Sequence, residues 1–317
     1  MPQSYETLRR SIEAKDRGMR EKVRSLEEAV DLIPEGAHVA VGGCHYSRTP
    51  MALLWEIIRR RRKNLSFSRS ITSTEGDLLL AGDVTRNIMT SWFSAGVTWG
   101  VSRVMREYVQ SGRARYEEWS HLSMGLRYRA GGMGVPFLPS RSMMGSGIAE
   151  RLPELKTIEC PYTGETLALI PALNPDVALI HVHRADAFGN AQIDGLPFMD
   201  ADIALAADKV ILSTERIVDN DQIRRSADRT FISFLCVEAV VEVPFGSMPH
   251  ECYGLYEPAF SHIDAYCKRI AADGAKGARA YLKTHCYSRN TWEDFLEKIG
   301  TKALLAASKA GREVDHG

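Results

Sequence analysis

Long apolar runs, paired cysteines and an excess of charge of either sign are all missing from this sequence. No apolar stretch reaches the roughly 20 residues that a membrane-spanning helix needs. The opening segment MPQSYETLRR lacks the apolar core of a secretory signal peptide. We therefore expect a cytoplasmic protein that does not cross a membrane.

The charges balance, because lysine and arginine together number 40 and so do aspartate and glutamate. A chain with zero formal net charge has no global attraction for nucleic acid or for an anionic membrane, so we expect neither as a partner. One dense basic run covers residues 59–63 and follows a helical apolar pattern. Positive charge complements the C-terminal end of a helix. We interpret this run as a solvated helix end, with a phosphate-binding patch as the alternative.

The six cysteines form no CxxC pair, which suits reduced thiols in a cytoplasmic protein. His181 and His183 alternate along a predicted strand and would share one of its faces. No third ligand has a recognisable spacing, so we expect these histidines to pack and to form hydrogen bonds, and we predict no metal site.

Short apolar runs alternate with amphipathic ones along the 317 residues, of which 44% are hydrophobic. Strands separated by helices predict an α/β fold with an open, largely parallel sheet and helices on both faces. Such sheets place ligands beyond the carboxyl ends of their strands. The expected strands cover residues 38–42, 65–71, 87–93, 176–185, 209–218 and 236–244. The expected helices cover residues 50–60, 100–112, 122–137, 259–274 and 291–311.

The predicted organisation is one main domain with an extension at each end. Residues 1–24 are charged and helical in pattern, which indicates an N-terminal helical arm. Ser25 and Glu28 have the spacing of a capping box and open the main domain, residues 25–290. Residues 291–317 are predicted to form a C-terminal helical tail.

A diglycine follows the first predicted strand, in the segment VAVGGCHYSRTP at residues 39–50. Glycine pairs adopt backbone conformations closed to other residues and let a ligand approach the main chain. Backbone amides aimed outward there can hold a carbonyl oxygen that is becoming negative, and one such donor is worth about 3 kcal/mol in a transition state. Taken alone, a diglycine is more often a tight turn without a ligand.

The surrounding motif, PEGAHVAVGGCHYSRTP, resembles the signature of class I coenzyme A transferases. Gly36, the diglycine and Pro50 match the signature, whereas Cys44 replaces its usual phenylalanine. Many members have glycine at the position of Arg48, but glutaconate CoA-transferase has arginine there. Three further segments resemble the alpha subunit of glutaconate CoA-transferase, and the resemblance then covers nearly the whole chain beyond residue 25. These segments are residues 116–148, 174–195 and 226–256.

The resemblance implies an alpha subunit of a heteromeric CoA-transferase that moves CoA between short, dicarboxylic or substituted carboxylic acids. A beta subunit would supply a glutamate that forms a glutamyl-CoA thioester in a ping-pong sequence. CoA or acyl-CoA would then be the substrate, with no permanently bound cofactor. A CoA-thioester hydrolase or decarboxylase of the same fold, such as a ring-cleaving hydrolase of steroid or aromatic catabolism, is the alternative. A binding or regulatory subunit is the third interpretation, and the intact diglycine loop argues against it.

The same resemblance implies a set of site residues in this chain. Backbone amides in the diglycine loop would form the oxyanion hole, and Arg48 would bind the distal carboxylate of a dicarboxylic acyl group. A solvated or paired arginine is the equal alternative for Arg48. The oxyanion-hole residues would be Gly42, Gly43 and Cys44. The further substrate-binding candidates are His45, Tyr46, Ser47, Ser73, Thr74 and His121.

Glu75 is the candidate nucleophile within this chain, because STEG at residues 73–76 loosely resembles the glutamate loop of the beta subunit. A glutamate at a helix start more often complements the helix dipole, and a serine there more often caps the helix. In ring-opening hydrolase relatives a glutamate lies near the place of His121, so the histidine here counts modestly against that chemistry.

Overall fold

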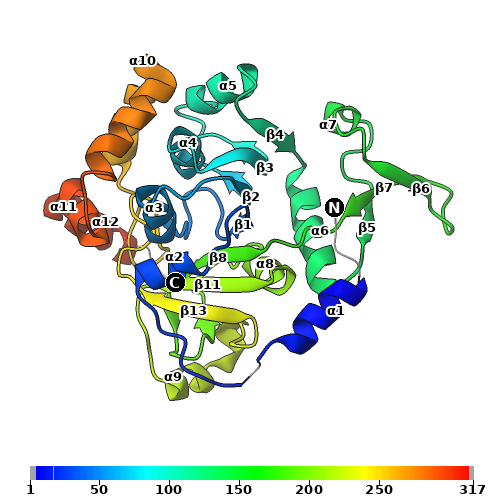
Figure 1. The fold of residues 1–317 in the computed structure, drawn as a ribbon, viewed down its shortest axis with the longest axis horizontal. Helices are drawn as coiled ribbons and strands as arrows, with labels where there is room; N and C mark the ends of the chain where they lie inside the picture. Colours follow the sequence, from blue (N-terminus) through cyan, green and yellow to red (C-terminus); the bar gives the residue numbers. More distant parts are fainter. Residues whose placement is uncertain (1–4, 17, 314–317) are drawn as a thin grey trace.

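Seven parallel strands form the central sheet of the structure, a computed structural model that describes residues 5–16 and 18–313. The strand order is β13-β11-β8-β1-β2-β3-β4, and every neighbouring pair is parallel (Figure 1). The predicted α/β architecture is thereby confirmed. The strands are β1 (His38–Val41), β2 (Leu65–Thr72), β3 (Thr85–Phe93), β4 (Arg115–Glu118), β8 (Val177–Val182), β11 (Lys209–Thr214) and β13 (Val237–Glu242).

Helices cover both faces of this sheet, and alternate strand residues face the two layers (Figure 1). Val39 and Val41 of β1 pack into one apolar cluster, whereas Ala40 packs into the other. This alternation follows from the two-residue period of a strand. Helices α2 (Leu26–Asp31), α3 (Met51–Arg59), α4 (Thr74–Ala81), α5 (Arg103–Gln110) and α10 (Phe260–His285) lie on the first face, and α6 (His121–Met133) and α8 (Asp200–Ala206) on the second.

The order in which strands are added to the sheet reverses at β1. The strands that follow β1 along the chain, β2 to β4, lie on one side of it, whereas β8, β11 and β13 lie on the other. In open parallel sheets the crevice beyond the carboxyl ends at such a reversal is the usual ligand site. The diglycine follows β1 directly, so it stands at this crevice beside β8.

Two small antiparallel sheets were not predicted. One contains β5 (Phe137–Ser140), β6 (Lys156–Glu159) and β7 (Thr166–Pro171), and the other contains β9 (Arg184–Ala185), β10 (Ala191–Gln192) and β12 (Thr230–Ile232). Most of these strands have four residues or fewer, which is too short for an apolar period to be read from the sequence. The remaining short elements are α7 (Gly147–Glu150), α9 (Asn220–Arg225) and a 3-10 turn, η1 (Ala227–Arg229).

The N-terminal segment contains α1 (Tyr5–Ala14) and then runs to the edge of the sheet at β13. The amide of Arg24 donates to Val240 O at 2.9 Å, and that of Lys22 donates to Ala187 O at 2.8 Å. The predicted capping box is confirmed, because Ser25 accepts from the Glu28 amide while the Glu28 carboxylate accepts from the Ser25 amide. Residues 1–4 of the predicted arm lie outside the described residues.

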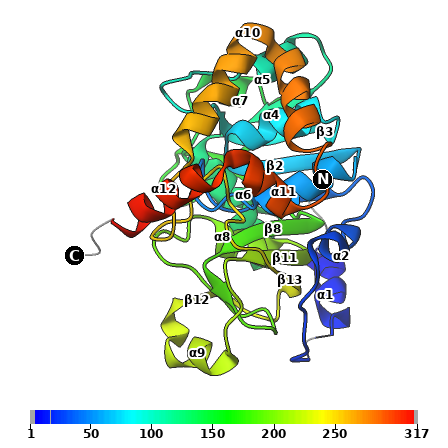
Figure 2. The same cartoon turned by 90° about the vertical axis from the view of Figure 1, so that its left-hand side faces the viewer.

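The C-terminal segment forms two helices, α11 (Trp292–Ile299) and α12 (Thr301–Arg312). Helix α11 lies beside α3 and α10, and α12 extends from it (Figure 2). The sequence predicted one continuous helix here, but Gly300 adopts a φ of 100° and ends α11. Trp292 and Phe295 are buried against Trp55 of α3. This segment therefore contributes to the core. Residues 314–317 of the predicted tail lie outside the described part.

The 26-residue α10 contains a kink at Gly274, where the φ is 54° and the backbone is not helical. The predicted helix over 259–274 ends at this glycine, and the structure continues into a second helical stretch. Among the described residues, no helix is both long and apolar enough to span a membrane.

The aromatic contact between α3 and α11 generates a stability prediction. Replacing Phe295, which is only 2% exposed, by alanine should lower the free energy of unfolding by about 3–5 kcal/mol because it leaves a cavity against Trp55. Leu305→Ala on α12 is the matched control, since Leu305 is 67% exposed and should cost less than about 0.5 kcal/mol. Urea unfolding of both variants measures the difference. Equal losses would mean that α11 does not anchor on the core.

Candidate active site at the carboxyl edge

The two glycines that leave β1 are required by their surroundings. A β-carbon on Gly42 would lie 2.8 Å from Asp200 Oδ1 and about 3.1 Å from the Ile180 side chain. Gly43 has a φ of +66°, and a β-carbon there would lie 2.2 Å from Ser47 O. Because both approaches are shorter than real side chains tolerate, this corner can be built only from glycine.

Asp200, the first residue of α8, contacts both the diglycine and Arg48. Its Oδ1 accepts the Gly43 amide at 2.7 Å, and its Oδ2 lies 2.5 Å from Arg48 Nη1. Both charged side chains are buried, with exposures of 0% and 1%. The Arg48 guanidinium also donates to His181 O and Leu196 O, at 3.1 and 2.8 Å. Its charge is thus neutralised and its donors are directed inward.

These contacts change the interpretation of Arg48. The sequence offered it as the ligand of a substrate carboxylate, with a paired arginine as the alternative. In the structure the guanidinium is already paired with Asp200 and is closed off from solvent, so the paired alternative describes it. A substrate carboxylate would have to displace a buried ion pair to reach it, which is costly because it leaves Asp200 without its counter-ion.

A second buried arginine, Arg69 of β2, secures the other side of the loop. It donates to Gly42 O at 3.2 Å, to Thr49 Oγ1 at 3.0 Å and to Glu75 Oε1 at 2.5 Å. His250 lies between two threonine hydroxyls, with its Nδ1 2.7 Å from Thr49 and its Nε2 2.7 Å from Thr74. Burial lowers the pKa of His250 well below its usual range, so the ring is neutral.

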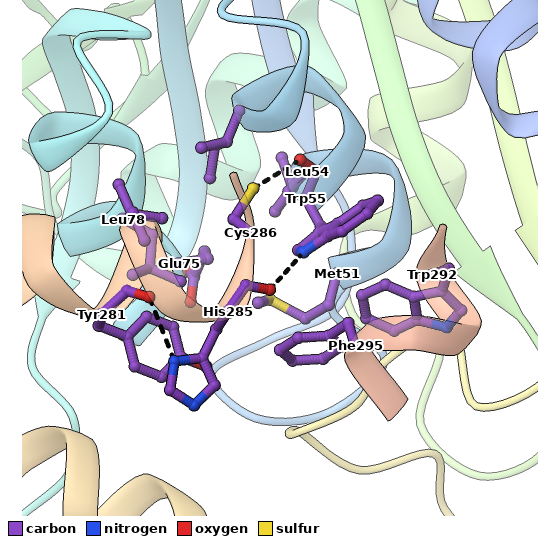
Figure 3. Close-up of a pocket in the computed structure, with 12 residues that line it drawn as sticks. Met51, Leu54, Trp55, Glu75, Leu78, Tyr281, His285, Cys286, Trp292 and Phe295 are labelled. Atoms are coloured by element: carbon purple, nitrogen blue, oxygen red, sulfur yellow. Dashed lines mark hydrogen bonds between the residues drawn. The ribbon is translucent and has the colours of Figure 1, made fainter. Parts of the chain in front are cut away.

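The proposed nucleophile Glu75 is closed off in this structure. Its side chain is 1% exposed, and its Oε1 accepts from Arg69 and from the Ser73 amide. The other oxygen, Oε2, has no hydrogen-bond partner within the described chain. Glu75 borders a small, mostly apolar cavity of about 20 Å³, which has room for about one water molecule (Figure 3). No acyl-CoA can reach this carboxylate without local opening of the fold.

The backbone amides assigned to an oxyanion hole are also engaged. Gly42 N donates to Leu179 O at 2.9 Å, Gly43 N to Asp200, and Cys44 N to Ser47 O at 3.0 Å. An oxyanion hole needs donors that are directed at the reacting oxygen. In this conformation none of the three amides is open to an external carbonyl.

The other predicted site residues divide into buried and accessible sets. Tyr46 is buried and donates its hydroxyl to Ala95 O, and Ser73 and Thr74 are buried as well. Cys44, His45 and Ser47 are half-buried at the surface of the loop, and His121 is exposed at the start of α6, 3.3 Å from Ser91 Oγ. The accessible set is therefore Cys44, His45, Ser47 and His121.

Burial sets the protonation of the two central accessible groups. It raises the pKa of the Cys44 thiol and lowers the pKa of the His45 imidazole. At neutral pH the surface of the loop thus presents an uncharged thiol and a neutral imidazole. Neither carries the negative charge that would repel an acyl thioester oxygen.

His181 of β8 and His183, which directly follows β8, form hydrogen bonds, as predicted. His181 contacts Ser213 Oγ at 2.9 Å and Glu215 Oε1 at 2.8 Å, and His183 contacts Tyr253 O at 2.8 Å. Within the described chain, His181, Glu215 and Cys252 bring three potential metal ligands within 4.8 Å of one another. Both His181 nitrogens and the Glu215 carboxylate are already committed to internal hydrogen bonds, so this set functions as a buried polar network.

Sequence reasoning did not find the residues that hold the loop. Asp200 lies more than 150 positions from Gly43, and His250 lies about 200 positions from Thr49. No local spacing links these positions, since only the folded sheet brings α8 and the segment after β13 to the end of β1. The sequence showed which loop is special but not its internal partners.

Several known proteins are similar to this chain. The sequence model of the family described as "Coenzyme A transferase" matches residues 23–243. One of the subunits of glutaconate CoA-transferase from Acidaminococcus fermentans is 30% identical over 86% of this chain and 90% of its own length. An uncharacterized protein of Archaeoglobus fulgidus is 38% identical over 92% of this chain, which spans 65% of that protein's length.

A further relative is named as the IpdA subunit of a cholesterol ring-cleaving hydrolase in Rhodococcus jostii. It is 30% identical over 72% of this chain and 80% of its own length. Among solved structures, glutaconate coenzyme A-transferase from Acidaminococcus fermentans superposes with a TM-score of 0.84 at 28% identity, covering 90% of this chain and 94% of the other. A variant of the decarboxylase AibA/AibB gives a TM-score of 0.73 at 30% identity, covering 84% and 100%.

These matches agree with the α/β fold and with the family that the diglycine motif indicated. The family match extends from the end of the N-terminal arm to the end of β13, and it includes the whole central sheet and the diglycine loop. The chain belongs to the coenzyme A transferase family.

Proposed function

We propose that this chain is the alpha subunit of a heteromeric CoA-transferase that moves CoA between short carboxylic acids. One observation carries the proposal: the diglycine loop lies at the carboxyl edge of the sheet, while Glu75, the nucleophile candidate of this chain, is buried and paired with Arg69. A glutamyl-CoA thioester then requires a glutamate from another polypeptide. A beta subunit whose carboxylate approaches Cys44 and His45 meets this requirement.

The relatives also favour an enzyme made of two different subunits. Glutaconate CoA-transferase contains more than one kind of subunit, and one of them is similar to this chain over nearly all of its length. We infer a short dicarboxylic or substituted acyl group as substrate, with CoA or acyl-CoA as the exchanging partner and no permanently bound cofactor. No disulfide bond joins any of the six cysteines, which supports a reducing compartment such as the cytoplasm.

An oxyanion hole at Gly42, Gly43 and Cys44 requires one of their amides to give up its internal hydrogen bond. The Gly43 amide would have to leave Asp200, or the Cys44 amide would have to leave Ser47 O, when acyl-CoA or the partner subunit binds. Cys44 is the better donor of the two, because a developing oxyanion beside Gly43 would be repelled by the Asp200 carboxylate. A Gly43→Val variant does not test this, since its β-carbon would lie 2.2 Å from Ser47 O in this structure and the substitution would disturb the loop itself.

A hydrolase or decarboxylase is the second candidate, because a ring-cleaving hydrolase subunit and a decarboxylase are both similar to this chain. The two candidates differ in the nucleophile. A Ser-Glu-Asn-Gly-like loop in the partner subunit supports transfer, and its absence supports hydrolysis or decarboxylation.

Reconstitution tests the central proposal. The purified chain alone should show no CoA transfer, and it should gain activity when its partner subunit is added, because the nucleophile then becomes available. Borohydride trapping during turnover should label a glutamate of the partner and leave Glu75 of this chain unlabelled. Turnover by the isolated chain, or label on Glu75, would overturn the two-subunit mechanism.

The ion pair makes a distinct prediction for Arg48→Met. Removing the arginine leaves Asp200 buried without its counter-ion, which should lower the free energy of unfolding by about 3–5 kcal/mol. Activity towards monocarboxylic and dicarboxylic acyl-CoA should fall by similar factors, since the whole loop loosens. The control is Arg224→Met, whose side chain is 76% exposed. A selective loss of dicarboxylic substrates at unchanged stability would return Arg48 to the substrate pocket.

His121 provides a test at the accessible edge. Because it is exposed beside Ser91, His121→Ala should lower kcat/KM for transfer about tenfold, equivalent to about 1.4 kcal/mol in the barrier, without shifting the unfolding temperature. Leu122→Ala is the neighbouring control, as Leu122 is 59% exposed and has no polar group. If both variants behave like the parent protein, His121 lies outside the substrate cleft.

A further inference from the structure

A basic groove lies at the amino edge of the sheet, away from the carboxyl edge that carries the diglycine loop. The loops that enter β2 and β3 form one wall, and the second half of α10 forms the other. The groove has a volume of about 590 Å³. Its charged side chains are Arg61, Lys63, Asp83, Arg279 and Lys283, and Gly82, Tyr287 and Ser288 also line it.

The four cations of this groove have no ionic partners. Lys63 and Lys283 are exposed, as are Arg61 and Arg279, and none of the four forms an ion pair with any residue of the described chain. Asp83 is the single acidic residue among the groove side chains. The groove thus carries four positive charges and one negative charge, a local excess of positive charge in a chain whose formal net charge is zero.

The basic run at residues 59–63 is divided by the fold, and this division isolates the groove. Arg59 pairs with Glu56 at 2.6 Å, and Arg60 pairs with Asp31 at 2.9 Å. Arg62 donates to the carbonyl of Ile33. These three arginines are therefore used within the protein, whereas Arg61 and Lys63 are left facing the groove.

Two of the lining positions have left-handed backbone. Helix α3 is followed by Arg61 at a φ of 53°, and helix α4 is followed by Asp83 at a φ of 56°. Glycine is the usual residue at a left-handed position after a helix, because a side chain is crowded there. Here both positions carry charged side chains into the same groove.

Arg61 is also held in place, since its guanidinium carbon lies 4.1 Å from the centre of the Tyr287 ring. Stacking on an aromatic face orients the guanidinium and leaves its edge donors available for an anion. Phosphate groups match such a fork, and lysine ammonium groups add positive charge beside it. The groove thus combines one oriented guanidinium with three further cations around an open space.

We propose that this groove is a binding site for an anion with a diphosphate or triphosphate group, such as a nucleoside triphosphate. The site is separate from the acyl-CoA edge and does not depend on the proposed transfer reaction. Four cations match the charge of such a group, and a single carboxylate or chloride would leave most of them without a partner. Because all four cations are solvent-exposed, binding should weaken as salt screens them.

Isothermal titration calorimetry with ATP and with inorganic tripolyphosphate tests the proposal on the full protein, with its partner subunit where the two copurify. At about 50 mM NaCl both anions should bind saturably, and binding should weaken at about 300 mM. The double variant Arg279→Glu/Lys283→Glu should raise Kd at least about tenfold. Arg151→Glu/Lys302→Glu, at exposed positions outside the groove, is the matched control and should change Kd less than about twofold.

Arg61→Gly separates binding from folding. This variant removes one cation and its stacking on Tyr287, but it also relieves the left-handed position, so it should weaken ATP binding without lowering the unfolding temperature. Absence of saturable binding for both anions would overturn the proposal, as would an unchanged Kd in the Arg279→Glu/Lys283→Glu variant. CoA transfer measured without added nucleotide should be the same in all groove variants, so the two proposals can fail separately.

Discussion

The structure of the diglycine loop depends on the contacts of the buried Asp200 carboxylate. This carboxylate accepts the amide of Gly43 with one oxygen and neutralises Arg48 with the other, so a single side chain of α8 fixes both the turn and the strand exit that precedes it. Since the arginine also holds two carbonyl groups, breaking this pair would leave several polar groups buried without partners. Gly42 is required by the same arrangement, because a β-carbon there would lie only 2.8 Å from the carboxylate oxygen.

Two buried arginines thus stabilise the same loop through different partners. Arg48 binds it to α8 and β8, while Arg69 binds it to Thr49 and to Glu75. The charged groups of this loop that could have acted on a substrate, Arg48 and Glu75, are instead buried in ion pairs. The accessible surface of the loop consists of the half-buried, uncharged side chains of Cys44 and His45. Such a surface suits the proposed role, in which this subunit orients a thioester and another chain supplies the attacking carboxylate.

Helices α3 and α4 connect this surface to the basic groove. Each begins at the carboxyl edge of the sheet and ends near the groove, where Arg61 follows α3 and Asp83 follows α4. A helix of eight or nine residues spans about 12–14 Å, so the two sites are close in space although they open at opposite edges. The fold therefore offers one edge for acyl-CoA chemistry and a second, independent edge with the charge to bind a phosphorylated ligand.

The sequence by itself determined the parallel α/β fold, the capping box at Ser25 and the diglycine loop at the end of β1, because these follow from local periodicity and from residue types confined to neighbouring positions. Only the tertiary structure decided what the polar residues of that loop do. Whether Arg48 faces a substrate or a carboxylate depends on α8, which is 152 positions away, and whether Glu75 can attack depends on its burial against Arg69 and α10. Burial and ion pairing are properties of the packed chain, and a linear pattern of residue types cannot specify them.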